Sequence, residues 1–248
     1  MMPATEGHSV GLPASLHALR RFMRGREPVR VAEEFCQMCG VSLASTHRHL
    51  LDLARHGILC ACDACALLFA NAGSGQGKYR LIPRRILALR DFQMSDEQWN
   101  ELMLPVNLLY LFRSTEAGRM VAFYPSPAGA MESLLDQENW ETLLRTNPVL
   151  NDLESEVEAL LINRMEQTRA YYLVPIDACY RLVGLLRVSW RGLSGGQEVW
   201  ERVTDFFAQL QAQATPVCAQ DDPARQFGHV VEVRHGEGED NGCTGSEL

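Results

Sequence analysis

Two Cys-x-x-Cys pairs constrain what this chain can fold into more than any other feature of its sequence. Cys36 pairs with Cys39 and Cys62 pairs with Cys65, and 22 residues separate the two pairs. Two thiolates three positions apart can grip one ion from a tight turn, and a second such pair completes a tetrahedron. The spacing therefore predicts a small zinc-ribbon-like metal module with these four cysteines as ligands. Zinc is the expected cofactor, and iron or an iron–sulfur cluster is the alternative.

Three further residues between the pairs have side chains that can ligate a metal: His47, His49 and Cys60. The intervening segment alternates as two hairpin arms, in a register that would set His49 opposite Cys62 and so beside the metal. These residues are candidates for alternative ligands, or for groups that hydrogen-bond to the ligands. Two interpretations stay open. Either they hold a second or exchangeable metal ion, or Cys60 is a buried apolar side chain and the histidines form local hydrogen bonds.

The distribution of the cysteines indicates metal chemistry rather than disulfide bonds. Five of the eight cysteines lie between Cys36 and Cys65, and the first residues do not show the basic and apolar pattern of a signal peptide. Clustered cysteines without such a segment are typical of a reducing compartment, so cytoplasmic localisation is the expectation. No stretch approaches the roughly 18 uninterrupted apolar residues of a membrane span.

The charge of the chain argues against nucleic acid as its main partner. The net charge is −8 and the isoelectric point is near 5.4, whereas phosphate neutralisation requires a basic surface. The charge is unevenly distributed, because the chain through Asp91 has 12 basic and 7 acidic residues. A zinc-ribbon protein that binds nucleic acid is therefore a further alternative, ranked behind an iron carrier.

The pattern along the chain predicts an α+β fold with a mostly antiparallel sheet. The expected organisation is an arm with a short amphipathic helix at 14–24 in residues 1–30, the metal module at 31–77, the α+β domain at 78–213 and a disordered acidic tail at 214–248. The expected strands are 79–82, 108–112, 120–124, 171–175 and 180–190. The expected helices begin at residue 95, follow residue 129, and span 150–165 and 198–213.

No catalytic residue can be assigned from the sequence. The segment 193–197 spells the signature loop of ABC-type ATPases, but the nearest candidate for a phosphate-binding loop, 72–79, lacks the first Gly and the final Ser or Thr. A polar pocket at the ends of the last strands could be lined by Asp177, Tyr180, Arg187 and Arg191. No nucleophile, base and orienting group can be named together, so the sequence favours a non-enzymatic role.

Six strings together resemble an uncharacterised bacterial family of unknown function. They are CQMCG at 36–40, HRHL at 47–50, LCACDACALLF at 59–69, FYPSPAG at 123–129, VPID at 174–177 and WRGLSGG at 190–196. The resemblance covers about residues 20–212. Members of that family are typically encoded beside actinobacterial-type nickel–iron hydrogenases. The resemblance therefore implies an accessory role in hydrogenase maturation or assembly, with a hydrogenase subunit or maturation factor as protein partner, and it leaves the oligomeric state open.

Overall fold

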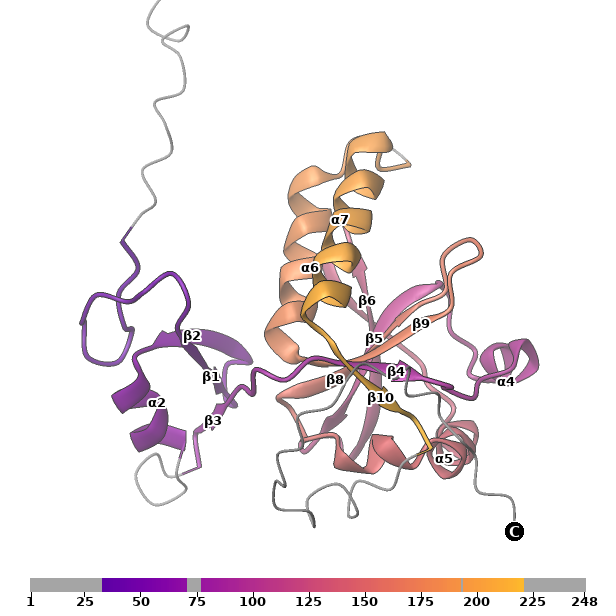
Figure 1. Cartoon of the computed structure of the whole chain (residues 1–248), viewed down its shortest axis with the longest axis horizontal. Coiled ribbons are helices and arrows are strands. Elements are labelled where there is room, and N and C mark those ends of the chain that lie inside the picture. Colours follow the sequence, from indigo (N-terminus) through magenta and orange to yellow (C-terminus); the bar gives the residue numbers. More distant parts are fainter. Residues whose placement is uncertain (1–32, 71–76, 193, 221–248) are drawn as a thin grey trace, which may run out of the picture. The chain divides into compact units, whose positions relative to one another are not determined.

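The computed structural model describes residues 33–70, 77–192 and 194–220 (Figure 1). The helix expected at 14–24 and the chain beyond residue 220 lie outside the described residues. By their contacts, residues from Phe35 onward form one unit, distinct from residues 1–34. This larger unit contains a three-stranded sheet and a seven-stranded sheet. Within the described ranges, every helix is too short or too polar to cross a bilayer.

The three-stranded sheet is built around the hairpin expected between the cysteine pairs. Its strands are β1 (Arg48–Asp52), β2 (Gly57–Ala61) and β3 (Tyr79–Leu81), in the order β2-β1-β3 with antiparallel pairing, and α2 (Asp63–Ala70) follows β2. The side chains of Cys36 and Cys65 pack with Leu50, Ala61 and Ala66 in one small buried core. Because β3 pairs with β1, this sheet extends past residue 77, the boundary expected from the sequence.

The register of the hairpin differs from the expected one by two residues. His49 pairs with Cys60 and not with Cys62. The turn explains the difference, because Oδ1 of Asp52 accepts hydrogen bonds from the backbone N–H groups two and three residues later, at 3.0 and 3.2 Å. Such a side-chain turn ends the strand at Asp52 and fixes the pairing. A shift of two residues keeps every side chain on its own face of the sheet, so the apolar face is unchanged.

The seven-stranded sheet confirms the predicted α+β class and the mostly antiparallel pairing. The strands are β4 (Leu87–Arg90), β5 (Leu108–Ser114), β6 (Arg119–Ser126), β7 (Gly129–Ser133), β8 (Glu158–Asn163), β9 (Ala170–Pro175) and β10 (Thr215–Cys218). Their order is β10-β4-β9-β8-β5-β6-β7, and β10 and β4 are the parallel pair. The hairpin expected over 108–124 is β5 with β6.

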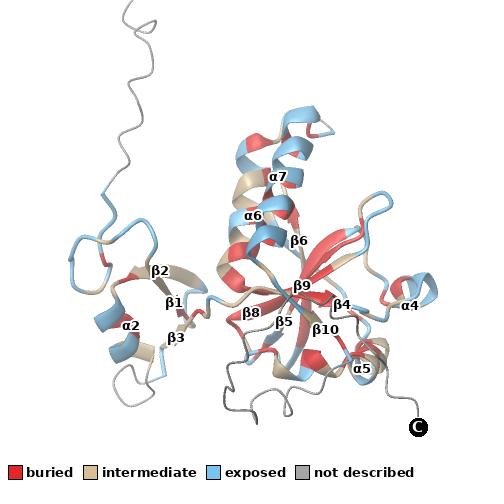
Figure 2. Cartoon of the chain, viewed as in Figure 1, coloured by how far each residue is buried: buried red, intermediate tan, exposed pale blue. Residues whose placement is uncertain are grey.

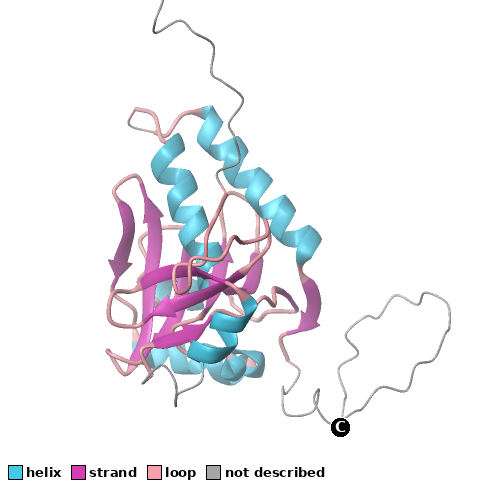
Figure 3. Cartoon of the chain, turned by 90° about the vertical axis from the view of Figure 1, so that its left-hand side faces the viewer, coloured by secondary structure: helices cyan, strands magenta, loops and turns pink. Residues whose placement is uncertain are grey.

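Helices cover both faces of this sheet, as Figure 1 and Figure 3 show. One face carries α6 (Ile176–Ser189) and α7 (Gln197–Gln213), and the other carries α4 (Asp96–Glu101), α5 (Gln137–Thr146) and the 3-10 helix η1 (Pro148–Asp152). In β5, Leu108 and Tyr110 pack in the core on the side of α6 and α7, whereas Leu109 and Leu111 pack in the core on the side of α4 and α5. This alternation follows the period of two of a strand. Both faces of the central strands are therefore buried (Figure 2).

Two expected elements in the α+β domain are wrong in type. The segment 150–165, expected as a helix, contains β8, which is buried at every position. A continuous apolar run has no period that separates a buried strand from a helix. The segment 180–190, expected as a strand, belongs to α6, where Cys179, Leu182 and Leu186 are buried at helical spacing. The helix expected after residue 129 is present as α5, but it begins at Gln137, and the strand β7 stands between it and residue 129.

The sheet continues beyond residue 213, where the acidic tail was expected to begin. Residues 215–218 form β10, which pairs with β4, and Ala219 is fully buried. Pro216 lies in this strand, and a proline is tolerated there because β10 is at the edge of the sheet. The expected cap of α4 is confirmed, since Ser95 and Gln98 form a reciprocal capping box.

A buried ion pair links β8 to the chain just before β4. The Glu158 side chain is 0% exposed, and it accepts hydrogen bonds from Nε and Nη2 of Arg85 at 2.5 and 2.7 Å. The backbone N–H of Glu154 donates to the same carboxylate at 3.0 Å. These donors compensate a charge that has left water.

Replacement of Arg85 by Met should lower the free energy of unfolding by about 3 kcal/mol, because it leaves the buried Glu158 carboxylate without its cation. Chemical denaturation followed by circular dichroism measures the change. Arg202→Met is the matched control, since Arg202 pairs with Glu198 on the exposed side of α7. That pair should contribute less than about 0.5 kcal/mol, and equal losses in the two variants would contradict the role given to Arg85.

Candidate metal centre

The structure brings together the four cysteines of the two pairs. The sulfur atoms of Cys36, Cys39, Cys62 and Cys65 all lie within 4.8 Å of one another, so they could hold one metal ion. The sulfurs of Cys39 and Cys62, which come from different pairs, are 3.8 Å apart. The two pairs thus converge as their spacing predicts, and ligation of a metal by them remains a prediction.

The first pair lies in a tight turn that backbone hydrogen bonds close. The N–H of Gly40 donates to the carbonyl of Cys36 at 2.7 Å, and the N–H of Cys36 donates to the carbonyl of Val41 at 2.8 Å. A bridge between Phe35 and Ser42 joins the two ends of the turn. Gly40 has a φ of 78°, a left-handed conformation that favours glycine. The glycine that follows the pair therefore allows the chain to reverse.

The second pair lies at the start of a helix and not in a second turn, which differs from a zinc-ribbon-like arrangement. Cys62 directly precedes α2, and Cys65 is in the first turn of that helix. The backbone N–H of Cys65 donates to the sulfur of Cys62 at 3.5 Å. The N–H groups and the dipole at a helix N-terminus stabilise a thiolate. The module therefore surrounds the four sulfurs with a turn, a hairpin and a helix start.

The two buried sulfurs have pKa values shifted in opposite directions. Burial raises the pKa of Cys36, but hydrogen bonds from the backbones of Cys62, Cys39 and Met38 outweigh burial and lower it to about 6. Burial raises the pKa of Cys65 to about 12, and hydrogen bonds with the neighbouring cysteine side chains act in the same direction. These shifts favour the thiolate form of Cys36 and the thiol form of Cys65, so a cation would have to displace the Cys65 proton.

The other three candidate ligands form a group of their own, which we call the His-Cys group: His47, His49 and Cys60. Their ligand atoms lie within 4.8 Å of one another. The position expected for His49, opposite Cys62, is wrong, because the register sets His49 opposite Cys60. Its Nδ1 is 2.6 Å from Oδ2 of Asp177 in the first turn of α6. Sequence reasoning did not identify this contact.

A cavity of about 490 Å³ opens beside the His-Cys group. Two of its lining residues, Asp177 and Tyr180, belong to the polar pocket that the sequence predicts. The other two residues expected in that pocket, Arg187 and Arg191, do not line this cavity. Its lining includes His47, His49, Asp177, Tyr180, Arg84 and Arg181.

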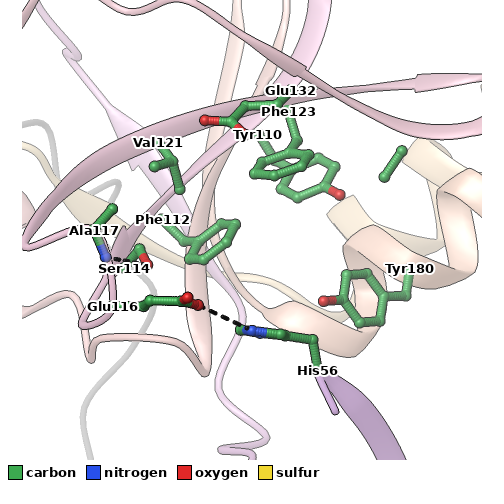
Figure 4. Close-up of a pocket in the computed structure, with 11 residues that line it drawn as sticks. His56, Tyr110, Phe112, Ser114, Glu116, Ala117, Val121, Phe123, Glu132 and Tyr180 are labelled. Atoms are coloured by element: carbon green, nitrogen blue, oxygen red, sulfur yellow. Dashed lines mark hydrogen bonds and ion pairs between the residues drawn. The ribbon is translucent and has the colours of Figure 1, made fainter. Parts of the chain in front are cut away.

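A further cavity, of about 500 Å³, has aromatic walls (Figure 4). Tyr110, Phe112 and Phe123 stack there with ring centroids 5.6 to 6.5 Å apart. On one side, Nε2 of His56 is 3.5 Å from Oε2 of Glu116. Sequence reasoning missed this cavity, although aromatic residues alternate along β5 and one faces them from β6. Its walls suit an apolar or aromatic small molecule.

Comparison with protein-family models gives a match for most of the chain. The model of a family of unknown function, DUF5947, matches residues 35–214. No curated protein and no solved structure matches the chain. The matched range contains the four-cysteine cluster, the His-Cys group and all of the seven-stranded sheet except β10. The description of the family gives no function for these features.

Zinc binding to the four-cysteine cluster should weaken as the pH falls from 8 to 6. The pKa of Cys65 is raised to about 12, so its proton must leave before the sulfur can coordinate, and protons compete better at low pH. The pKa of Cys36 is lowered to about 6, so this sulfur adds little competition until the pH approaches 6. Competition with a chromophoric chelator at several pH values measures the affinity. A constant affinity over this range would contradict the assigned protonation states.

Proposed function

We propose that this chain, which belongs to DUF5947, a family of unknown function, is a non-catalytic zinc-binding accessory protein. The residues of the chain itself support this proposal. The observation that carries this proposal is the approach of four cysteine sulfurs to within 4.8 Å of one another. Four thiolates complete the tetrahedral coordination of structural zinc and leave no position for a reacting water. The metal then holds the module together, and the protein acts through contacts with other proteins.

The partner we propose is a subunit or maturation factor of a nickel–iron hydrogenase, in the cytoplasm. This part of the proposal rests on the resemblance of the six sequence strings to a family encoded beside such enzymes. The protein would support maturation or assembly of the hydrogenase without catalysing a reaction at its own metal.

Exposed apolar side chains on the module support a docking role. Phe35 and Val41 flank the first cysteine pair and are 51% and 50% exposed, and Leu68 on α2 is 52% exposed. Because about half of each of these three side chains is exposed, they are not part of the buried core of the module. They are typical of a surface that a protein partner covers.

An iron or iron–sulfur carrier is the alternative, and a fifth cysteine in the cluster would favour it. Cys60 belongs to the His-Cys group and not to the four-cysteine cluster, so it adds no ligand to the cluster. Four cysteines can still hold iron. Protein purified without oxygen separates the two proposals, because a thiolate-bound iron site is coloured and a zinc site is colourless.

Cys36→Ser should lower the zinc content of the purified protein by one equivalent per chain and lower its melting temperature. The variant removes one ligand from the cluster, and a structural zinc ion stabilises the fold that binds it. Elemental analysis and thermal denaturation measure the two effects. Cys179→Ala is the matched control, because Cys179 is a buried cysteine of the large core outside the cluster. A chelator that leaves the melting curve of the wild type unchanged would oppose a structural zinc.

A tagged protein, expressed in its host, should retain hydrogenase subunits or a maturation factor on purification. The double variant Phe35→Ser, Val41→Ser should lose the partner while it keeps its zinc, because these side chains are exposed and do not ligate the metal. Mass spectrometry of the retained proteins and metal analysis give the two readouts. An empty purification, together with normal hydrogenase activity in a strain that lacks the protein, would refute this partner.

A further inference from the structure

We propose that His47, His49 and Cys60 form a second metal site, which holds an exchangeable divalent transition-metal ion with one coordination position open toward the adjacent cavity. This site goes beyond the proposed function, and it shares no ligand with the four-cysteine cluster. Its ligand atoms lie within 4.8 Å of one another, a separation that one ion can bridge.

The hairpin places the three side chains together. His49 in β1 is paired with Cys60 in β2, and side chains of directly paired residues lie on the same face of a sheet. His47 lies directly before β1, two positions from His49. The two imidazole rings meet edge to face with centroids 4.9 Å apart. The register that differs from the expected one is thus the feature that creates this site.

Hydrogen bonds fix which nitrogen of each imidazole can bind a metal. Nδ1 of His47 is 3.0 Å from the carbonyl oxygen of Ala44, and Nδ1 of His49 is 2.6 Å from the carboxylate of Asp177. A carbonyl and an ionised carboxylate can only accept, so Nδ1 is the protonated nitrogen in both rings. The lone pair of each neutral ring is then on Nε2. A metal-binding histidine in proteins commonly donates its other N–H to such an oxygen, which orients the ring.

The alternative interpretation, a buried apolar cysteine beside histidines in local hydrogen bonds, describes only His47, whose Nδ1 is 3.0 Å from the carbonyl oxygen of Ala44. A cysteine that serves as an apolar core residue is buried, whereas Cys60 is only partly buried. The His49 side chain is 30% exposed and the Asp177 side chain 24% exposed. The pair is therefore reachable from solvent, and a carboxylate bound to a partly exposed imidazole is the arrangement that orients the ring as a ligand.

The number of ligands implies an open position. Two imidazole nitrogens and one thiolate leave a tetrahedral ion one ligand short, as in zinc sites that bind water or a substrate. Both histidines line the cavity of about 490 Å³, together with Arg84 and Arg181. The two guanidinium groups favour an anion as the fourth ligand. Mixed nitrogen and sulfur donors suit zinc, cobalt, nickel or copper ions rather than magnesium or calcium.

Titration of the full-length, metal-depleted protein with cobalt(II) tests this site. The wild type should bind two ions per chain, and one of the two should show the weaker thiolate-to-metal absorption of a site with a single cysteine. His49→Asn and Cys60→Ser should each bind one ion, with the strong absorption of the four-cysteine cluster retained as proof of folding. His56→Asn is the matched control, because His56 lies in the turn of the same hairpin and outside the group, and it should bind two.

The outcomes separate the two sites. If the wild type binds a single ion, or if Cys60→Ser still binds two, the second site does not exist. Loss of the strong absorption in Cys36→Ser with the weak one retained would show the second site without the first. Sodium azide should change only the weak spectrum, and a spectrum that azide leaves unchanged would refute the open position.

Asp177→Asn tests the positioning role of the carboxylate. Loss of such an outer hydrogen-bond partner lowers metal affinity by about 10- to 100-fold, so the second cobalt ion should bind that much more weakly while the first binds as before. A merely structural role for Asp177 would change thermal stability but not the ratio of the two affinities. An unchanged second affinity would overturn the assignment of Asp177.

Discussion

The convergence of four cysteine sulfurs on one point is the constraint on which the small module depends. Among the described residues, its buried core consists of Leu50, Ala61 and Ala66 with the side chains of Cys36 and Cys65, and the apolar side chains packed around that core are only partly buried. So small an apolar core rarely stabilises a folded unit without a metal or another cross-link. Four sulfurs within 4.8 Å of one another cannot all ionise unless a cation compensates their charge. Folding of the module and metal binding are therefore one coupled process in the proposed function.

The module also contributes to the core and contacts of the large sheet. Leu51 joins the core under α6 and α7, and its strand neighbour Arg80 donates to the carbonyl of Ser155 at 2.6 Å. The carboxylate of Asp177 reaches His49 from the first turn of α6. Tyr180, one turn later on the same helix, lines both the cavity beside the His-Cys group and the aromatic cavity. Binding or loss of a metal ion at the hairpin would thus act, through the contact of His49 with Asp177, on α6, the helix that borders both cavities.

The sequence was sufficient for features that local chemistry decides. The two Cys-x-x-Cys pairs predict the convergence of their sulfurs, and the helix start at Ser95 predicts α4, because each is a short motif whose residues lie three positions apart. The type of β8 could not be predicted, since an apolar run buried on both sides loses the period that distinguishes a strand from a helix. In α6, by contrast, Cys179, Leu182 and Leu186 keep a helical spacing that the expected strand did not take into account. The hairpin register depended on one side chain, Asp52, whose carboxylate accepts two backbone hydrogen bonds in the turn. The contact of His49 with Asp177 joins residues 128 positions apart, and no local pattern indicates it.

The two candidate metal sites are linked through one residue. Gln37 lies inside the first cysteine pair, its backbone N–H donates to the carbonyl of Cys60 at 2.9 Å, and its side-chain oxygen accepts from the N–H of Cys60 at 2.7 Å. A metal ion in the four-cysteine cluster would fix the turn that carries Gln37 and so hold Cys60 in place for the His-Cys group. The ordering cost of the second site would then be met partly by the first ion, which gives positive coupling between the sites. The closed cluster would act as the scaffold, and the open site as the part that exchanges its ligand.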